Sequence, residues 1–382
     1  MLPFDFQPTT RIVFGAGKVD SLGELARDLG ARRAMVVSDP GIIAAGHAQH
    51  GVDSLRNAGL EAELFEGVHE NPTTKDVDNG LAAARDFQPD LLVGLGGGSS
   101  MDCAKGVNFL YTNGGRMQDY WGDGKATQPM LPMIAVPTTA GTGSEAQSFA
   151  LISDADTHVK MACGDKKAAC RIAILDPVLT LTQPPRVTAH TGIDAISHAL
   201  ETFVTRDRNA VSLAFSRQAW SLLSENFGRV LDDPTDLEAR GAMQLGACFA
   251  GLAIENSMLG ATHALANPLT ACYDVPHGQA IAIMLPHVIR FNGAEFPQWY
   301  ADLMRSASSN GSPESRGGPE ELAQLVASLV TRSGLIARLA DCGVERDRLG
   351  ELADDAAGQW TATFNPRPVS RDELLALYNS AY

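Results

Sequence analysis

The feature that most constrains the fold is an alternation, through the first half of the chain, of short apolar runs with amphipathic stretches. The apolar runs each end in a turn rich in Gly, Pro or Thr, and they lie at residues 11–15, 32–41, 90–100, 130–139 and 171–177. Between them, residues 19–30 and 73–87 carry apolar side chains at helical spacing. Strands that alternate with helices predict a doubly wound, Rossmann-like parallel sheet.

The second half of the chain differs in its pattern. After about Pro184 the strand signals disappear, and helical patterns continue to residue 382. Residues 177–188 are dense in Pro and Thr, which indicates a linker into a helix that starts around Thr188. A chain of 382 residues is also too long for one ordinary core. We therefore expect an α/β domain at 1–183 and a helical, metal-binding domain at 184–382, with an exposed loop or mobile insertion at 308–321.

Composition narrows the class of function. The net charge of −15 disfavours binding to nucleic acid or to an anionic membrane surface. The chain has no apolar run long enough to span a bilayer, and its first residues do not resemble a signal peptide. The six cysteines form no CxxC pair, which fits a reducing compartment. We expect a cytoplasmic protein that acts on small molecules.

A glycine run follows one of the apolar strands directly and precedes a helix. It comprises Gly96, Gly97, Gly98 and Ser99. Glycines let the backbone approach a phosphate closely, and the free N–H groups at a helix start attract negative charge. The run is not the GxGxxG fingerprint, and a tight strand-to-helix turn is the alternative interpretation.

Two further features favour a nucleotide. Residues 137–147 follow a hydrophobic strand and place three threonines, two glycines and a serine around a turn. Asp39 closes another strand, where an acidic group pairs with the ribose hydroxyls of an adenosine and repels a 2′-phosphate, which favours NAD over NADP. A helix N-cap ahead of Pro40 is the other interpretation of Asp39.

Four residues have the spacing and setting of metal ligands. Asp194 and His198 are four residues apart in a strongly helical context, on one face. His263 and His277 interrupt an apolar segment that carries almost no charge. A single histidine there would more often be a hydrogen-bonded core residue, but a shared metal would satisfy all four groups. Three nitrogens and one carboxylate oxygen suit Fe(II), Zn(II), Co(II) or Ni(II) better than Mg or Ca.

These motifs, in this order and spacing, resemble the iron-containing (group III) alcohol dehydrogenases. The segments are GGGSSMDCAKG, PTTAGTGSE, GIDAISHALE and the HGQA to LPHV stretch. The resemblance implies an N-terminal dinucleotide-binding domain, a helical metal domain, and hydride transfer in the cleft between them. It implies that the metal ligands are Asp194, His198, His263 and His277. It implies that the cofactor contacts are Asp39, Gly97, Gly98, Ser99, Thr138, Thr139, Thr142 and Lys160.

The sequence departs from this family at one position. Many members have a histidine four residues after the third ligand, near the substrate and the nicotinamide, whereas this chain has Asn267. An amide can contact a substrate through a hydrogen bond but cannot take up a proton near neutral pH. A proton relay at this position is therefore not expected.

The reaction that we expect is hydride transfer between NAD(H) and a small alcohol or aldehyde. A divalent metal polarises the carbonyl oxygen, and Fe(II) is expected in preference to Zn(II). The alternatives are a glycerol dehydrogenase-like enzyme, a dehydroquinate synthase-like enzyme, and a non-catalytic relative. The dehydroquinate synthase type usually needs several basic residues for a phosphorylated substrate, and residues 188–305 carry few. A homodimer or a higher homo-oligomer is the default expectation.

Overall fold

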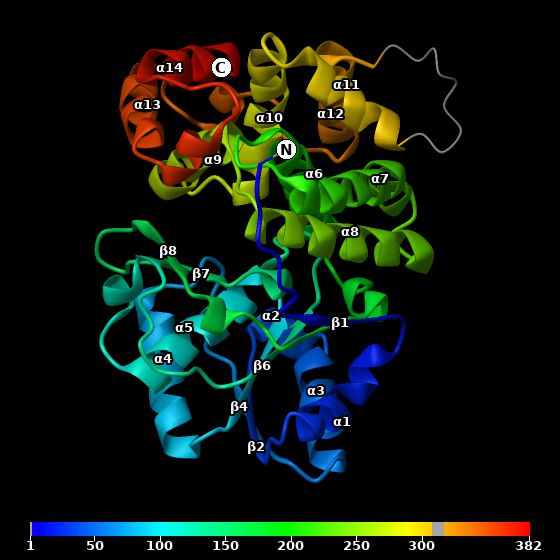
Figure 1. The fold of residues 1–382 in the computed structure, drawn as a ribbon, viewed down its shortest axis with the longest axis vertical. Coiled ribbons are helices and arrows are strands. Elements are labelled where there is room, and N and C mark those ends of the chain that lie inside the picture. Colours follow the sequence, from blue (N-terminus) through cyan, green and yellow to red (C-terminus); the bar gives the residue numbers. More distant parts are fainter. Residues whose placement is uncertain (1, 308–316) are drawn as a thin grey trace. The chain divides into compact units, whose positions relative to one another are not determined.

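The computed structural model describes residues 2–307 and 317–382, and the chain divides into two compact units. One unit is Gln7–Gln183, and the other combines Met1–Phe6 with Pro184–Tyr382. The first six residues therefore belong with the C-terminal part of the chain, and the boundary between the units lies after Gln183 (Figure 1).

The first unit is built on a six-stranded sheet in which every neighbouring pair of strands is parallel. The strand order is β1-β9-β6-β4-β2-β3, so β2, β4, β6 and β9 are the interior strands. The strands are β1 (Arg11–Phe14), β2 (Arg33–Val37), β3 (Glu61–Phe65), β4 (Leu91–Gly96), β6 (Met133–Pro137) and β9 (Ile172–Leu175). The helices of this unit are α1 (Leu22–Asp28), α2 (Pro40–Ala44), α3 (His47–Asn57), α4 (Thr74–Phe87) and α5 (Gly98–Asn113).

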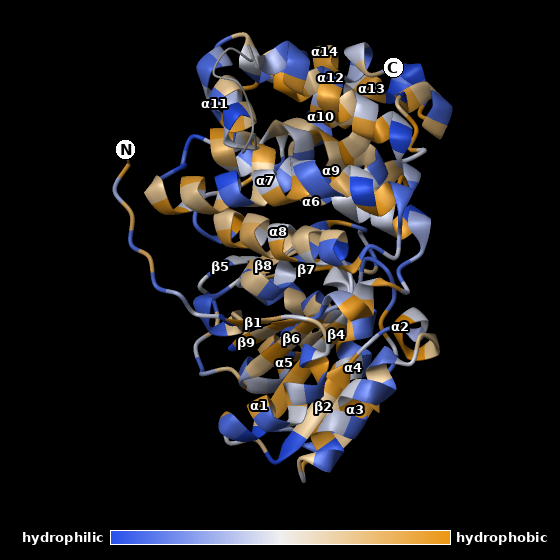
Figure 2. Ribbon diagram, turned by 90° about the vertical axis from the view of Figure 1, so that its right-hand side faces the viewer, coloured by the Kyte–Doolittle hydropathy of each residue, from blue (hydrophilic) through white to orange (hydrophobic). Residues whose placement is uncertain are grey.

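Side chains of the interior strands alternate between two apolar cores. In β4, Leu91, Val93 and Leu95 pack with α1 and α3, whereas Leu92 faces the opposite way and packs with α4 and α5. The two helix pairs lie on opposite sides of the sheet in Figure 1, and the strands are mostly orange in Figure 2. A strand buried on both faces has no polar side to show, which explains the continuous apolar runs in the sequence.

The connections reverse direction between β2 and β4. The chain leaves β2 for α3 on one face of the sheet, and it leaves the neighbouring β4 for α5 on the other face. Ligands of doubly wound sheets bind where such a reversal opens the carboxyl ends of adjacent strands. The fold class predicted from the sequence, doubly wound α/β followed by all-α, is confirmed.

Several strands of the structure were not predicted from the sequence. They are β3 at the edge of the main sheet and the small sheet β5 (Gly122–Asp123), β8 (Lys160–Gly164) and β7 (Phe149–Ser153), in that spatial order. Two of the five residues of β3, Glu61 and Glu63, are charged and exposed, so the strand lacks the apolar run of its neighbours. Strands β7 and β8 are short and pair antiparallel with each other, so their pairing depends on contacts that the sequence pattern does not display.

The second unit has no strand among its described residues. Its helices are α6 (Pro185–Val204), α7 (Ala210–Asp232), α8 (Leu237–Glu255), α9 (Ala261–Tyr273), α10 (His277–Gly293), α11 (Pro297–Ala307), α12 (Pro319–Arg332), α13 (Leu349–Ala357) and α14 (Arg371–Ser380). Helix α6 begins at Pro185 and not at Thr188, because a proline is well tolerated at the first helical position. Most of the later residues of α6 are buried, so it forms the centre of the unit.

The prediction of a loop at 308–321 is wrong for its last three residues. Residues 319–321 form the first turn of α12, where Pro319 is the first helical residue and Glu320 and Glu321 supply acidic groups that favour a helix start. Residues 308–316 lie outside the described residues. Within the described part of the chain, none of the helices has the length and apolar character needed to cross a lipid bilayer.

The cysteines generate a prediction about thiol reactivity. All six are free, and four of them are buried, whereas Cys272 is exposed and Cys342 is half-buried. Burial raises the pKa of Cys163 to about 12 and that of Cys170 to about 11, so neither forms a thiolate near neutral pH. We expect a chromogenic disulfide reagent to modify two thiols in the native protein and six after denaturation.

Raising the pH from 7 to 9 should accelerate the modification of the two accessible thiols and leave the buried ones unmodified. Replacing Cys272 with Ser should reduce the native count to one. Rapid modification of a third thiol in the folded protein would contradict the burial described here.

Candidate metal centre and cofactor site

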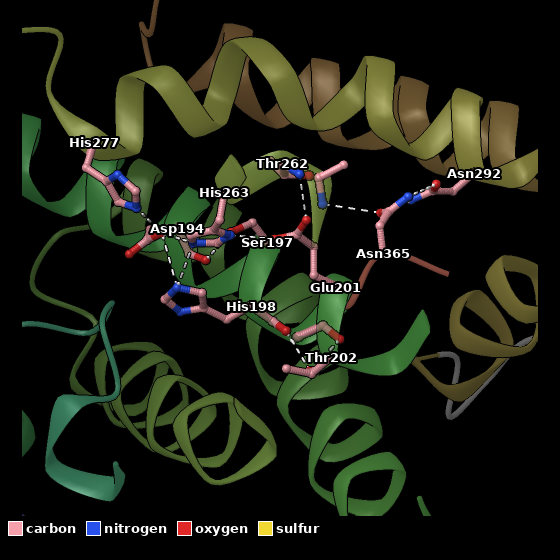
Figure 3. A network of polar contacts seen from close by, with 12 residues as sticks. Asp194, Ser197, His198, Glu201, Thr202, Thr262, His263, His277, Asn292 and Asn365 are labelled. Atoms are coloured by element: carbon pink, nitrogen blue, oxygen red, sulfur yellow. Dashed lines mark hydrogen bonds and ion pairs between the residues drawn. The ribbon is translucent and has the colours of Figure 1, made fainter. Parts of the chain in front are cut away.

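The four predicted metal ligands come from three helices of the second unit. Asp194 and His198 lie one turn apart on α6, His263 lies in the first turn of α9, and His277 is the first residue of α10. Figure 3 shows their side chains directed toward one another. The structure thus brings together residues that are up to 83 positions apart in the sequence.

Close packing of α10 on α6 places His277. A Cβ atom on Gly278 would lie 2.3 Å from the backbone oxygen of His190, so only glycine permits this approach. His190 precedes Asp194 by one helical turn. The start of α10 is therefore fixed against the part of α6 that carries the carboxylate.

The distances between the candidate ligand atoms are short and similar. Oδ1 of Asp194 lies 3.3 Å from Nε2 of His198, 3.5 Å from Nε2 of His263 and 3.7 Å from Nε2 of His277. The Nε2 atoms of His198 and His263 are 3.1 Å apart. Asp194, His263 and His277 form a cluster in which all ligand atoms lie within 4.8 Å of one another, and His198 joins it through its contacts with the first two.

This arrangement fits a single divalent transition-metal ion. Four ligands about 2.1 Å from one ion lie roughly 3.4 Å apart, which is the spacing found here. Asp194 is 5% exposed, and its Oδ1 lacks a hydrogen bond of normal geometry within the described part of the chain. A buried carboxylate oxygen without a donor is costly unless a cation neutralises it. The donor set of three imidazoles and one carboxylate suits iron or zinc.

In the metal-free site, the pKa values of the candidate ligands depend strongly on one another. Burial alone would raise the pKa of Asp194, but the surrounding imidazoles outweigh it and hold that pKa well below its usual range. Burial alone would lower the pKa of His263, but the carboxylates of Glu201 and Asp194 raise it to about 9. Positive charge is therefore favoured at this point of the helical unit, whether it is carried by a proton or by a metal.

A further carboxylate supports the site from behind, and the sequence analysis missed it. Glu201 is on α6, 5% exposed, and its Oε2 contacts Nδ1 of His263. Its Oε1 accepts the backbone N–H of Thr262 at 2.7 Å. The available signal was Glu201 itself, an acidic residue three positions after His198 on the same buried part of the helix.

Asn267 has a protein partner in this structure. It lies one turn beyond His263 on α9, half-buried, and its Nδ2 donates to Oε1 of Gln359 at 3.0 Å. Neither amide can exchange a proton near neutral pH, so the absence of a proton relay at this position stays a prediction. Contact of Asn267 with a substrate stays a prediction.

In the first unit, the two predicted cofactor loops meet at the start of α5. A Cβ atom on Gly98 would lie 2.7 Å from the side chain of Thr142, and one on Gly97 would lie 3.5 Å from Thr139. Ser99 follows in the first turn of α5, where its Oγ accepts the backbone N–H of Asn71 at 3.3 Å. The glycines therefore pack closely against the threonine loop, at the positive end of a 16-residue helix.

Asp39 and Thr138 lie beside this point. Asp39 is the N-cap of α2, with Oδ1 accepting the N–H groups of Gly41 and Ile42, and its Oδ2 accepts from Ser100 Oγ at 3.0 Å. The N-cap interpretation is thus confirmed, and it leaves a ribose contact untested. Thr138 Oγ1 is buried and has no hydrogen-bond partner among the described residues, which suits a contact to a bound cofactor.

A buried lysine fixes the threonine loop to α5, and the sequence analysis missed this as well. Lys105 is fully buried, and its Nζ donates to Ser144 O, Ser144 Oγ and Phe149 O at 2.7, 2.8 and 2.9 Å. Ser144 Oγ in turn donates to Asp102 at 2.6 Å. Lys160, the first residue of β8, is half-buried and its charge acts on Asp102.

Comparison with known proteins places this geometry in a family. Residues 8–177 match the model of iron-containing alcohol dehydrogenase, and residues 188–382 match that of the C-terminal part of the Fe-containing alcohol dehydrogenase family. The chain belongs to the iron-containing alcohol dehydrogenase family. The resemblance noted from the four sequence motifs is therefore confirmed, and with it the class of enzyme and the cofactors, NAD(H) and a divalent metal.

Relatives within this family match along almost the whole chain. The 1,3-propanediol dehydrogenase of Klebsiella pneumoniae is 34% identical, with 99% of each chain covered. The NAD-dependent methanol dehydrogenase of Bacillus methanolicus is 32% identical, with 97% of each covered. A crystal structure of a 1,3-propanediol oxidoreductase superposes with a TM-score of 0.94 at 33% identity, covering both chains completely.

The convergence of four ligands predicts that the metal stabilises the helical unit. We expect chelation to lower the thermal midpoint of this enzyme by about 5 °C, because an ion that binds only the folded state stabilises it by mass action. His263→Ala and His277→Ala should weaken metal binding by more than about a hundredfold, since even outer contacts to ligands are worth tenfold to a hundredfold. Competition with a chromophoric chelator measures this affinity.

His287→Ala is the matched control. His287 lies on the same helix as His277, but its Nδ1 is 3.0 Å from Ser380 Oγ, and it is not part of the cluster of candidate ligands found among the described residues. This variant should retain the affinity of the unmodified enzyme. Equal metal loss from the control and from His277→Ala would remove the ligand assignment.

Proposed function

We propose that this enzyme interconverts small primary alcohols and aldehydes with NAD(H), and that its site residues are those predicted from the sequence. The observation that carries the proposal is the convergence of Asp194 and three imidazoles on a point where positive charge is favoured. A bound metal supplies Lewis-acid polarisation of a substrate oxygen, and NAD(H) supplies or accepts the hydride.

The helical unit holds the metal through Asp194, His198, His263 and His277. Four protein ligands leave room for the coordination sphere to expand toward a substrate oxygen. The imidazoles present Nε2 toward that point. The amides of Asn267 and Gln359 can orient a hydroxyl group but cannot remove its proton, so at this position they provide orientation and no proton transfer.

The α/β unit holds the cofactor, in this proposal, at the carboxyl ends of β2 and β4. Backbone N–H groups at Gly97, Gly98 and Ser99 receive the pyrophosphate at the start of α5. Thr138, Thr139 and Thr142 contact the cofactor from the facing loop, supported by the close packing of that loop against the glycines. Lys160 contributes a positive charge from β8.

The relatives' names indicate short alcohols and diols as the substrate class. We propose a substrate of similar size for this enzyme. The free state of all six cysteines is consistent with a cytoplasmic location. We also propose a homodimer or a higher homo-oligomer, the usual state of a soluble enzyme.

The substrate class can be tested directly. Enzyme reconstituted with Fe(II) or Zn(II) should form NADH from members of a panel of C2 to C6 alcohols and diols and should oxidise NADH with the matching aldehydes. The chelated enzyme and the His263→Ala variant should both be inactive. Absence of turnover with the whole panel, in enzyme shown to contain metal, would contradict the proposal.

Selection of NAD by Asp39 can be separated from its capping role. Asp39→Asn keeps an oxygen for the N–H groups of Gly41 and Ile42 but removes the charge that would repel a 2′-phosphate. We expect kcat/KM with NADP to rise about tenfold or more. Ser100→Ala is the control, because it breaks the hydrogen bond to Asp39 and leaves the charge in place. An unchanged cofactor preference in Asp39→Asn would assign Asp39 to helix capping alone.

A further inference from the structure

Glu201 is an acidic side chain that contacts the candidate ligand His263 from the side away from the metal position. Its two oxygens have different partners. Oε2 faces Nδ1 of His263, and Oε1 accepts the backbone N–H of Thr262. The residue is 5% exposed and His263 is 4% exposed, so water does not compete for either contact (Figure 3).

The chemistry of these partners constrains where the proton of His263 lies. A backbone N–H can only donate, so Oε1 must accept. An ionised carboxylate also only accepts, so the imidazole must donate from Nδ1 to Oε2. In a neutral ring the proton is then on Nδ1, and Nε2 presents its lone pair toward Asp194 and His198.

We propose that Glu201 is a positioning residue that fixes His263 in the tautomer required for metal binding and holds its ring in place. The inference rests on the proposed metal centre and adds the device that prepares it. Carboxylates that orient ligand imidazoles in this way typically contribute tenfold to a hundredfold in metal affinity. Because Glu201 also accepts Thr262 N–H, it is anchored to the same turn of α9 that carries His263.

A second contact holds the start of α9 without touching the imidazole. Asn365 Oδ1 accepts the N–H of Ala261 at 3.2 Å, and the amides of Asn365 and Asn292 exchange hydrogen bonds of 2.8 and 3.0 Å. Figure 3 shows this amide pair on the far side of Glu201 from the histidines. Asn365 therefore supports the helix start, whereas Glu201 supports both the helix start and the ring.

The decisive variant is Glu201→Gln, which is nearly the same size. A glutamine has one acceptor and one NH2 group, so it cannot accept from both Thr262 and His263. If its oxygen keeps the backbone N–H, its NH2 group faces Nδ1 and favours the tautomer with the proton on Nε2, directed at the metal. We expect zinc affinity, measured by chelator competition, to fall tenfold to a hundredfold.

Asn365→Ala is the matched control. It removes an acceptor from the same helix start, so it should lower the thermal midpoint, but it should change zinc affinity by less than about threefold. Glu201→Asp keeps the charge and shortens the side chain by one methylene, and it should give a loss smaller than that of Glu201→Gln. If both Glu201 variants bind zinc as tightly as the unmodified enzyme, the proposal is wrong.

The tautomer can also be read in the unmodified enzyme, which protects the test from a variant that fails to fold. In protein labelled with 15N-histidine and loaded with zinc, long-range 15N–1H spectra should show the proton of His263 on Nδ1, and the resonance is assigned with His263→Ala. A proton on Nε2 would overturn the proposal. Zinc affinity and tautomer are measured without substrate, so they remain informative if the enzyme does not oxidise alcohols.

Discussion

A carboxylate oxygen buried against three imidazole nitrogens is the interaction on which the helical unit depends. Burial makes the negative charge of Asp194 expensive, and only the positive charge of the imidazoles or of a metal offsets that cost. The packing of α6, α9 and α10 meets this need, because each helix brings one end or one face to the same point. The close approach of α10 to α6 at Gly278 is part of this packing.

The same compensation of a buried charge is found at Glu201, behind the candidate ligands. Glu201 is itself a buried carboxylate, and it is stabilised by an imidazole and by a backbone N–H at the start of a helix, where the peptide dipoles favour negative charge. The ring of His263 on α9 thus lies between two carboxylates of α6, with Glu201 at its Nδ1 and Asp194 at its Nε2. The α/β unit also contains a buried charge, that of Lys105. It is compensated by three oxygens, and these contacts hold the threonine loop in place.

Much of the fold could be predicted from the sequence because the relevant signals are local. Strands buried on both faces must be apolar throughout, so β2, β4, β6 and β9 were visible as runs. Strand β3 and the small sheet were not, because an edge strand and short antiparallel pairs have no distinctive pattern of their own. The helix start at Pro319 was also missed, since Pro and Gly mark both a loop and the entry to a helix.

The sequence by itself determined the four candidate ligands, because charged and imidazole side chains in apolar helices need a partner wherever the helices are placed. It also determined the two cofactor loops, whose glycines and threonines follow buried strands. Only the tertiary structure decided which side chains contact these residues and hold them in place. The contacts of Glu201 with His263 and of Lys105 with Ser144 join elements 62 and 39 positions apart, and such pairings depend on helix packing that no local pattern encodes.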